Sequence, residues 1–186
     1  MKTLLISVWI LSMGACAAQT PAVPSTTAVL KQAQALRAQG RIEEAAAELE
    51  KIGVHLSPGG KQMSYLEYAS TQYNAGHLEA AADAYRKGIL AAPKTSIAGL
   101  MHYDLGTLRD KQHDYAQAVP EYRAALKLQD KQTAAWTCLL LGDDLNKLGR
   151  NSEARSAWTQ ALTADDDAKT GARKIARTRL AAWKKL

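Results

Sequence analysis

Four histidines are the side chains of this sequence best suited to proton transfer or metal binding. His55, His77 and His113 fall in stretches with turn character, and His102 stands alone in a helical stretch. None has a Cys, His or Glu at the spacing of a metal site, and the acidic run at 165–167 is typical of a solvated loop or a helix start. No Gly-rich phosphate loop, nucleophile elbow or pair of catalytic carboxylates occurs. The sequence therefore predicts that the protein is not an enzyme and uses no cofactor or metal.

The N-terminus has the pattern of an export signal. Lys2 gives a positive start, residues 4–13 are apolar, and residues 14–17 are small. The apolar run is about ten residues long, whereas a membrane-spanning helix needs about twenty. We expect residues 1–18 to be a signal peptide and residues 17–25, which contain Pro and Ala, to be a linker.

Cys16 leaves two processing routes open. Residues 13–16, Met-Gly-Ala-Cys, resemble a bacterial lipobox, although that motif usually has Leu where Met13 stands. The resemblance implies acylation of Cys16, and Ala17 after it implies an outer-membrane lipoprotein facing the periplasm. Ordinary signal cleavage would instead discard Cys16 and release a soluble periplasmic protein. Cys138 then remains in an apolar stretch, which predicts a small buried hydrophobe and no internal disulfide.

Residues 26–168 are periodic. Four alanines recur at intervals of 36, 37 and 36 residues, with a bulky residue four positions after each and a small residue twelve before each. A fixed period in this range indicates stacked supersecondary units. The residues expected to pack these units are Ala45, Ala69, Ala81, Tyr85, Gly106, Ala118, Tyr122, Gly142, Ala154 and Trp158.

These positions resemble the tetratricopeptide repeat, or TPR, in four copies over residues 26–60, 62–95, 99–132 and 135–168. The resemblance implies an all-α, right-handed solenoid of about four helix-turn-helix units, in which small residues let paired helices approach and aromatic rings fill the space between units. Gly40, Gly76 and Gly149 should end first helices in the left-handed conformation. In the third unit His113 stands at that position, and Asp114 is expected to cap the next helix.

Residues 169–186 contain seven Lys or Arg and no acid, and their apolar residues share one face of a helix. They are expected to form a capping helix over the last unit, with Arg179 paired to an acid of that unit. The chain has a net charge of +6, of which this segment supplies +7, so the rest sums to −1. This concentration of basic residues in one segment argues against nucleic-acid binding, because a nucleic-acid binder spreads them along its binding surface. A solvated face and a site for an acidic partner or anionic lipid remain alternatives.

The resemblance also implies that the first helix of each unit lines a concave, partner-binding surface. A stripe of large apolar residues predicts an apolar floor with a polar edge, suited to an amphipathic helix or an extended peptide. The Lys/Asn clamp with which some family members bind a carboxylate terminus is not reproduced. The family's contact positions fall on Leu30, Gln34, Arg37, Met63, Leu66, Ser70, Tyr73, Asn74, Leu100, Tyr103, Thr107, Asp110, Lys111, Trp136, Leu139, Asp143, Asn146 and Lys147.

The sequence thus predicts a protein-binding scaffold of the bacterial cell envelope. It is similar to small TPR lipoproteins that assist pilus or secretion-system assembly, and this step is an analogy of architecture. The alternatives are a soluble periplasmic chaperone-like binder and an accessory subunit of a peptidoglycan enzyme. The expected partner is another envelope protein, with a lipid anchor to the membrane if Cys16 is acylated.

Overall fold

The computed structural model describes residues 25–53, 56–164 and 171–183. Cys16, the signal peptide, most of the linker and the acidic run at 165–167 lie outside these residues. Within them the chain forms nine helices and no strand, as the sequence predicted. The helices are α1 (Thr26–Ala38), α2 (Ile42–Gly53), α3 (Pro58–Asn74), α4 (Leu78–Ala91), α5 (Ser96–Lys111), α6 (Tyr115–Leu126), α7 (Lys131–Lys147), α8 (Asn151–Thr163) and α9 (Ala172–Trp183).

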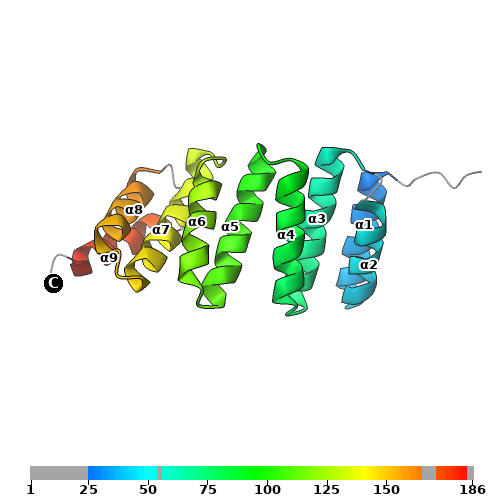
Figure 1. Ribbon diagram of the computed structural model, residues 1–186, viewed down its shortest axis with the longest axis horizontal. Coiled ribbons are helices and arrows are strands. Elements are labelled where there is room, and N and C mark those ends of the chain that lie inside the picture. Colours follow the sequence, from blue (N-terminus) through cyan, green and yellow to red (C-terminus); the bar gives the residue numbers. More distant parts are fainter. Residues whose placement is uncertain (1–24, 54–55, 165–170, 184–186) are drawn as a thin grey trace, which may run out of the picture.

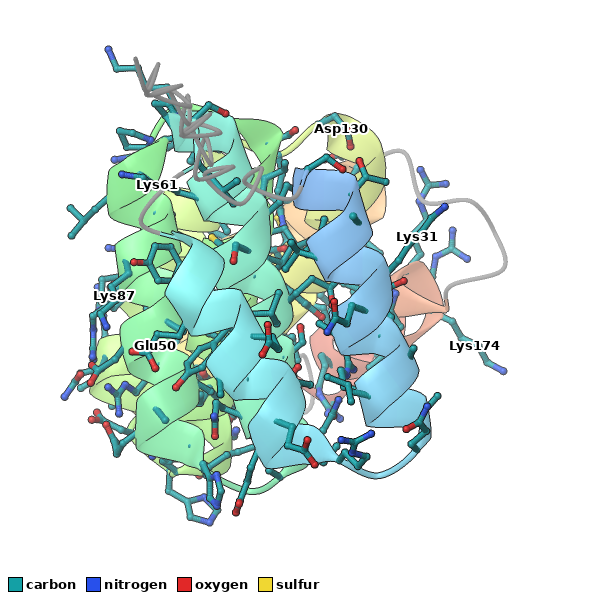
Figure 2. The ribbon with its side chains drawn as sticks, turned by 90° about the vertical axis from the view of Figure 1, so that its right-hand side faces the viewer. Lys31, Glu50, Lys61, Lys87, Asp130 and Lys174 are labelled. Carbon is teal, nitrogen blue, oxygen red and sulfur yellow. The ribbon has the colours of Figure 1, made fainter. Side chains whose placement is uncertain are left out.

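The helices are stacked in chain order along the longest axis of the molecule (Figure 1). Consecutive helices pair as α1 with α2, α3 with α4, α5 with α6 and α7 with α8, and each pair also packs against the next. An end view separates two sides: Glu50 and Lys87 lie on the side of the second helices, and Lys31 and Lys174 on the opposite side (Figure 2). We call the surface formed by α1, α3, α5 and α7 the first-helix face.

The turns inside the four pairs share one backbone geometry. Gly40, Gly76 and Gly149 have φ of 74°, 83° and 72°, and His113 has φ of 61°. After each of them, the next N–H donates to the carbonyl five residues earlier at 2.8 or 2.9 Å, which closes the helix end. Asp114 accepts from the Gln117 N–H at 3.2 Å, as predicted for a cap. His113 therefore adopts a conformation that ordinarily favours glycine.

Small residues meet aromatic rings where the two helices of a unit pack together. A methyl group added at Gly106 would lie 2.7 Å from Cε1 of Tyr122, and one at Gly142 would overlap the Trp158 ring. All ten residues expected to pack the units are buried in the structure. The close approach leaves no room for a side chain at either glycine.

Helix α9 caps the stack by packing against both α7 and α8. Ala172 and Ala176 are fully buried, and Ile175, Leu180 and Trp183 pack beside them, whereas Ala182, assigned to the same face from the sequence, is exposed. Arg179 pairs with Asp143 of α7 at 3.0 Å, as expected. None of the helices in the part of the chain described here has the length and apolarity to cross a bilayer.

Candidate functional site

A hollow of about 320 Å³ opens on the first-helix face between the first three units. We call it the central hollow. Its walls come from α1, α3 and α5, and one ring reaches it from α4 behind them. The lining residues are Arg37, Ser70, Tyr73, Asn74, Tyr85, Asp104 and Thr107.

Five of these lining residues stand at contact positions predicted from the sequence. Ser70, Tyr73 and Asn74 follow one another along α3 at the helical period, so they share a side of the helix. Asn74 is exposed, and Arg37 and Thr107 are partly buried. The prediction missed Asp104, and it placed Tyr85 only in the packing between units. Asp104 stands three residues before Thr107, so helical spacing alone would have put the two on one side.

The structure leaves the predicted apolar stripe only partly accessible. Leu30, Leu66, Tyr103 and Trp136 are partly buried because they pack against core clusters. Leu139 is 2% exposed and belongs to the core of the last two units and α9, so it is unavailable to a partner. Leu100 is 43% exposed, and Met63 is partly buried. The stripe is therefore open to a partner at Leu100, partly open at Met63 and the four partly buried residues, and closed at Leu139.

Asp104 lies in the wall of the central hollow and forms a hydrogen-bonded chain with two hydroxyls. The Tyr85 hydroxyl donates to the Asp104 carboxylate and accepts from Ser70. Burial raises the pKa of Asp104 to about 6, and the hydrogen bond from Tyr85 opposes this only in part. Thr107 donates its hydroxyl hydrogen to the Asp104 carbonyl at 2.8 Å.

A second polar cluster joins the third and fourth units. Lys147 donates to Asp110 at 2.6 Å and to Asp144 at 3.0 Å, and its Nζ lies 4.2 Å from the centre of the Tyr115 ring. Asp144 is 1% exposed, and burial raises its pKa. Its Oδ2 and the hydroxyl of Tyr122 are buried with no hydrogen-bond partner among the described residues. The sequence showed no sign of this carboxylate pair, because its members are 34 positions apart.

The remaining predicted contact residues of the third and fourth units are engaged by neighbours or exposed. Asp143 accepts from Trp158 Nε1 and from Arg179, each at 3.0 Å. Lys111 contacts the hydroxyl of Tyr73, and its Nζ lies 4.3 Å from the centre of that ring. Asn146 is exposed.

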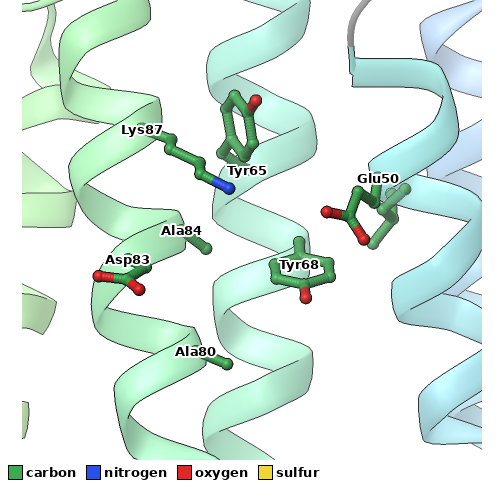
Figure 3. A pocket seen from close by; sticks show the side chains of 8 residues that line it. Glu50, Tyr65, Tyr68, Ala80, Asp83, Ala84 and Lys87 are labelled. Atoms are coloured by element: carbon green, nitrogen blue, oxygen red, sulfur yellow. The ribbon is translucent and has the colours of Figure 1, made fainter.

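The second helices also leave cavities between neighbouring units. The gap between α2 and α4 holds about 160 Å³, with Tyr65 and Tyr68 at its base and Glu50 and Lys87 extending from opposite sides (Figure 3). Another, of about 330 Å³, separates α6 from α8. We favour the central hollow as the site, because it is twice the volume of the first gap and, unlike either gap, it lies on the face predicted to bind a partner.

The histidines within the described residues each contact one neighbouring side chain. His77 Nδ1 lies 2.7 Å from Gln72, His102 Nδ1 lies 2.7 Å from Glu121, and His113 contacts Tyr115. His55 lies outside the described residues. No group of three His, Cys, Asp or Glu in the described ranges could hold a metal ion. Cys138 is buried, and burial raises its pKa to about 11, which makes it a poor nucleophile.

The sequence matches no protein-family model and no curated protein. Among solved structures, MamA is similar with a TM-score of 0.64 and 18% identity over 76% of this chain and 78% of that one. A MamA from Desulfovibrio magneticus RS-1 has a TM-score of 0.62 and 19% identity over 77% of this chain and 78% of its own. YrrB, a TPR protein with an unusual peptide-binding site, has a TM-score of 0.58 and 20% identity over 77% and 76% of the two chains. This chain therefore has the TPR fold.

Proposed function

We propose that this protein is an interaction scaffold that binds a segment of a partner protein in the central hollow. The observation that carries this is the hollow itself, a polar recess of about 320 Å³ on the first-helix face. Hydroxyl and amide groups of Ser70, Asn74 and Thr107 line it and can hydrogen-bond the backbone of an extended peptide. The peptide-binding site of YrrB, on a similar fold, supports the same use of this one.

A photo-crosslinking amino acid placed at position 74 tests this function. Asn74 is exposed at the edge of the hollow, so a bound segment should yield a covalent adduct there. Gln160 is the matched control, because it is also exposed but lies on α8 in the gap facing α6. An adduct from position 74 with none from position 160 is the expected result. Equal adducts from both positions, or none from position 74, would contradict the proposal.

We further propose that the scaffold works in the bacterial cell envelope, assisting pilus or secretion-system assembly. The export pattern of residues 1–18 and the lipobox-like residues 13–16 support this, and both rest on the sequence. Radioactive palmitate should label the wild type and leave Cys16→Ser unlabelled. Equal labelling of the two proteins would show that Cys16 is not the acylated residue, and this would contradict the proposed lipid anchor. Mass spectrometry of the adducts formed at position 74 in native cells would identify the partner.

A further inference from the structure

The charges on the first helices of the four units are matched at every carboxylate but one. These helices contain five carboxylates in all. Glu67 pairs with Arg37 at 3.0 Å, Asp143 pairs with Arg179, and Asp110 and Asp144 share Lys147. The fifth, Asp104, has no ion pair within the described ranges of the chain, and it is the one that lines the central hollow.

The cations closest to the hollow are already engaged. Arg37 lines it but donates to Glu67, and the side chain of Glu67 is itself only 20% exposed. Lys111 contacts the hydroxyl of Tyr73 and lies over its ring. Both cations have other partners, and neither forms an ion pair with Asp104 among the described residues.

We propose that Asp104 receives a positively charged group of the bound segment, either a Lys or Arg side chain or a free amino terminus. This proposal rests on the proposed function and names the chemistry of its partner. Tyr85 donates a hydrogen bond to the carboxylate and itself accepts one from Ser70, so the carboxylate is already oriented before the ligand arrives. A partly desolvated carboxylate forms strong hydrogen bonds with ammonium or guanidinium groups.

Anionic ligands fit this recess poorly. A carboxylate or phosphate placed beside Asp104 would meet a like charge in a partly desolvated setting, which disfavours binding. Asn74, at the rim, can donate to and accept from a peptide backbone without regard to its sequence. The hollow thus combines one charge-selective contact with neutral contacts for the main chain.

Selection from a phage-displayed library of random peptides tests this specificity on the full-length protein. The wild type should enrich peptides with a basic residue at one position or a charge at the amino terminus. The affinity of the selected peptide is then compared for the wild type, Asp104→Asn and Asp83→Asn. Asp83 is the matched control, because it is an exposed acid on α4 that lines a gap on the other side of the molecule. Acetylating the amino terminus of the peptide removes one source of positive charge, and replacing its Lys or Arg residue with Met removes the other, so the two modified peptides show which group binds.

Asp104→Asn should weaken binding about tenfold to a hundredfold, as expected for a lost charge-assisted hydrogen bond, and Asp83→Asn should leave it unchanged. Neutralising the peptide should produce the same loss with the unmodified protein, so the test holds even if Asp104→Asn fails to fold. Enrichment of peptides that lack a positive charge, or equal affinity of the wild type and Asp104→Asn for the selected peptide, would overturn this inference. Either result would leave the proposed scaffold function standing. Failure to enrich any peptide would overturn both.

Discussion

Two junctions of the solenoid carry the same kinds of side chain in opposite arrangements. Between the second and third units, the Tyr85 hydroxyl is hydrogen-bonded to Asp104, and both residues line an open hollow. Between the third and fourth units, the equivalent Tyr122 hydroxyl has no partner within the described part of the chain, and the carboxylates there are closed off by Lys147. A repeated backbone thus leaves an open recess at one junction and an internal cluster at the next, depending on where one lysine lies.

Lys147→Met should give the largest effect on stability. It leaves Asp110 and Asp144 without their cation, and Asp144 is 1% exposed, so we expect a loss of about 2–3 kcal/mol at pH 8. The loss should shrink at pH 5, because burial raises the pKa of Asp144 and the neutral acid needs no counter-ion. Lys111→Met, at the equivalent position one unit earlier, should cost about 0.5–1 kcal/mol at either pH. Urea unfolding followed by circular dichroism measures the free energy of unfolding of both variants. Equal losses for the two variants would contradict the proposed difference between the junctions.

Asp104→Asn should stabilise the protein at high pH. The pKa of Asp104 is raised to about 6 in the folded state, above about 3.9 in the unfolded chain. The folded state therefore holds a proton that the unfolded state releases, so this group's contribution to stability falls as pH rises from about 4 to about 6. With an allowance for the partial exposure of Asp104, the free energy of unfolding of the variant should exceed that of the wild type by about 1–2 kcal/mol at pH 8. The two values should match near pH 4.

The groups around Asp104 bear on the interpretation of this pH profile. They are Arg37 from α1, Tyr73 from α3, Tyr85 from α4 and Tyr103 on its own helix. Burial raises the pKa of both Tyr85 and Tyr103, so these rings stay neutral throughout the range. A difference in unfolding free energy that did not change between pH 4 and pH 8 would contradict the raised pKa.

Two conservative substitutions should have effects of opposite sign. Tyr85→Phe removes a hydroxyl that donates to Asp104, and it should cost about 1 kcal/mol. Tyr122→Phe removes a buried hydroxyl without a partner among the described residues, so it should be neutral or stabilise by up to about 1 kcal/mol. Thermal unfolding of both variants at pH 7 provides the comparison. A larger loss for Tyr122→Phe would mean that its hydroxyl is satisfied after all.

The fold could be predicted because its determinants recur at equal spacing and act locally. Gly142 and Trp158 belong to the two helices of one unit, so their contact follows from the repeat. Left-handed turns at Gly40 and His113 follow in the same way from the position of each residue in its unit.

The site could be predicted only in part. The resemblance to the tetratricopeptide repeat pointed to Ser70, Tyr73 and Asn74, because the family's contact positions share one face of a first helix. Side-chain exposure depends on how much of that face the neighbouring units cover, and for this reason Leu139 is buried while Leu100 remains 43% exposed. Nor does spacing reveal which of several acids a long lysine will reach, as Lys147 reaches Asp110 on another helix.

The ionisation of Asp104 tests the central claim most directly. Carbon-detected NMR of the side-chain carboxyl, titrated in the free protein, should show a midpoint at pH about 6, because this carboxylate lies in the wall of the hollow without a cation from the described chain. A midpoint below about 4 would place it in the ordinary range of a solvated or ion-paired aspartate. That result would show that the central hollow holds no unmatched charge for a partner to meet.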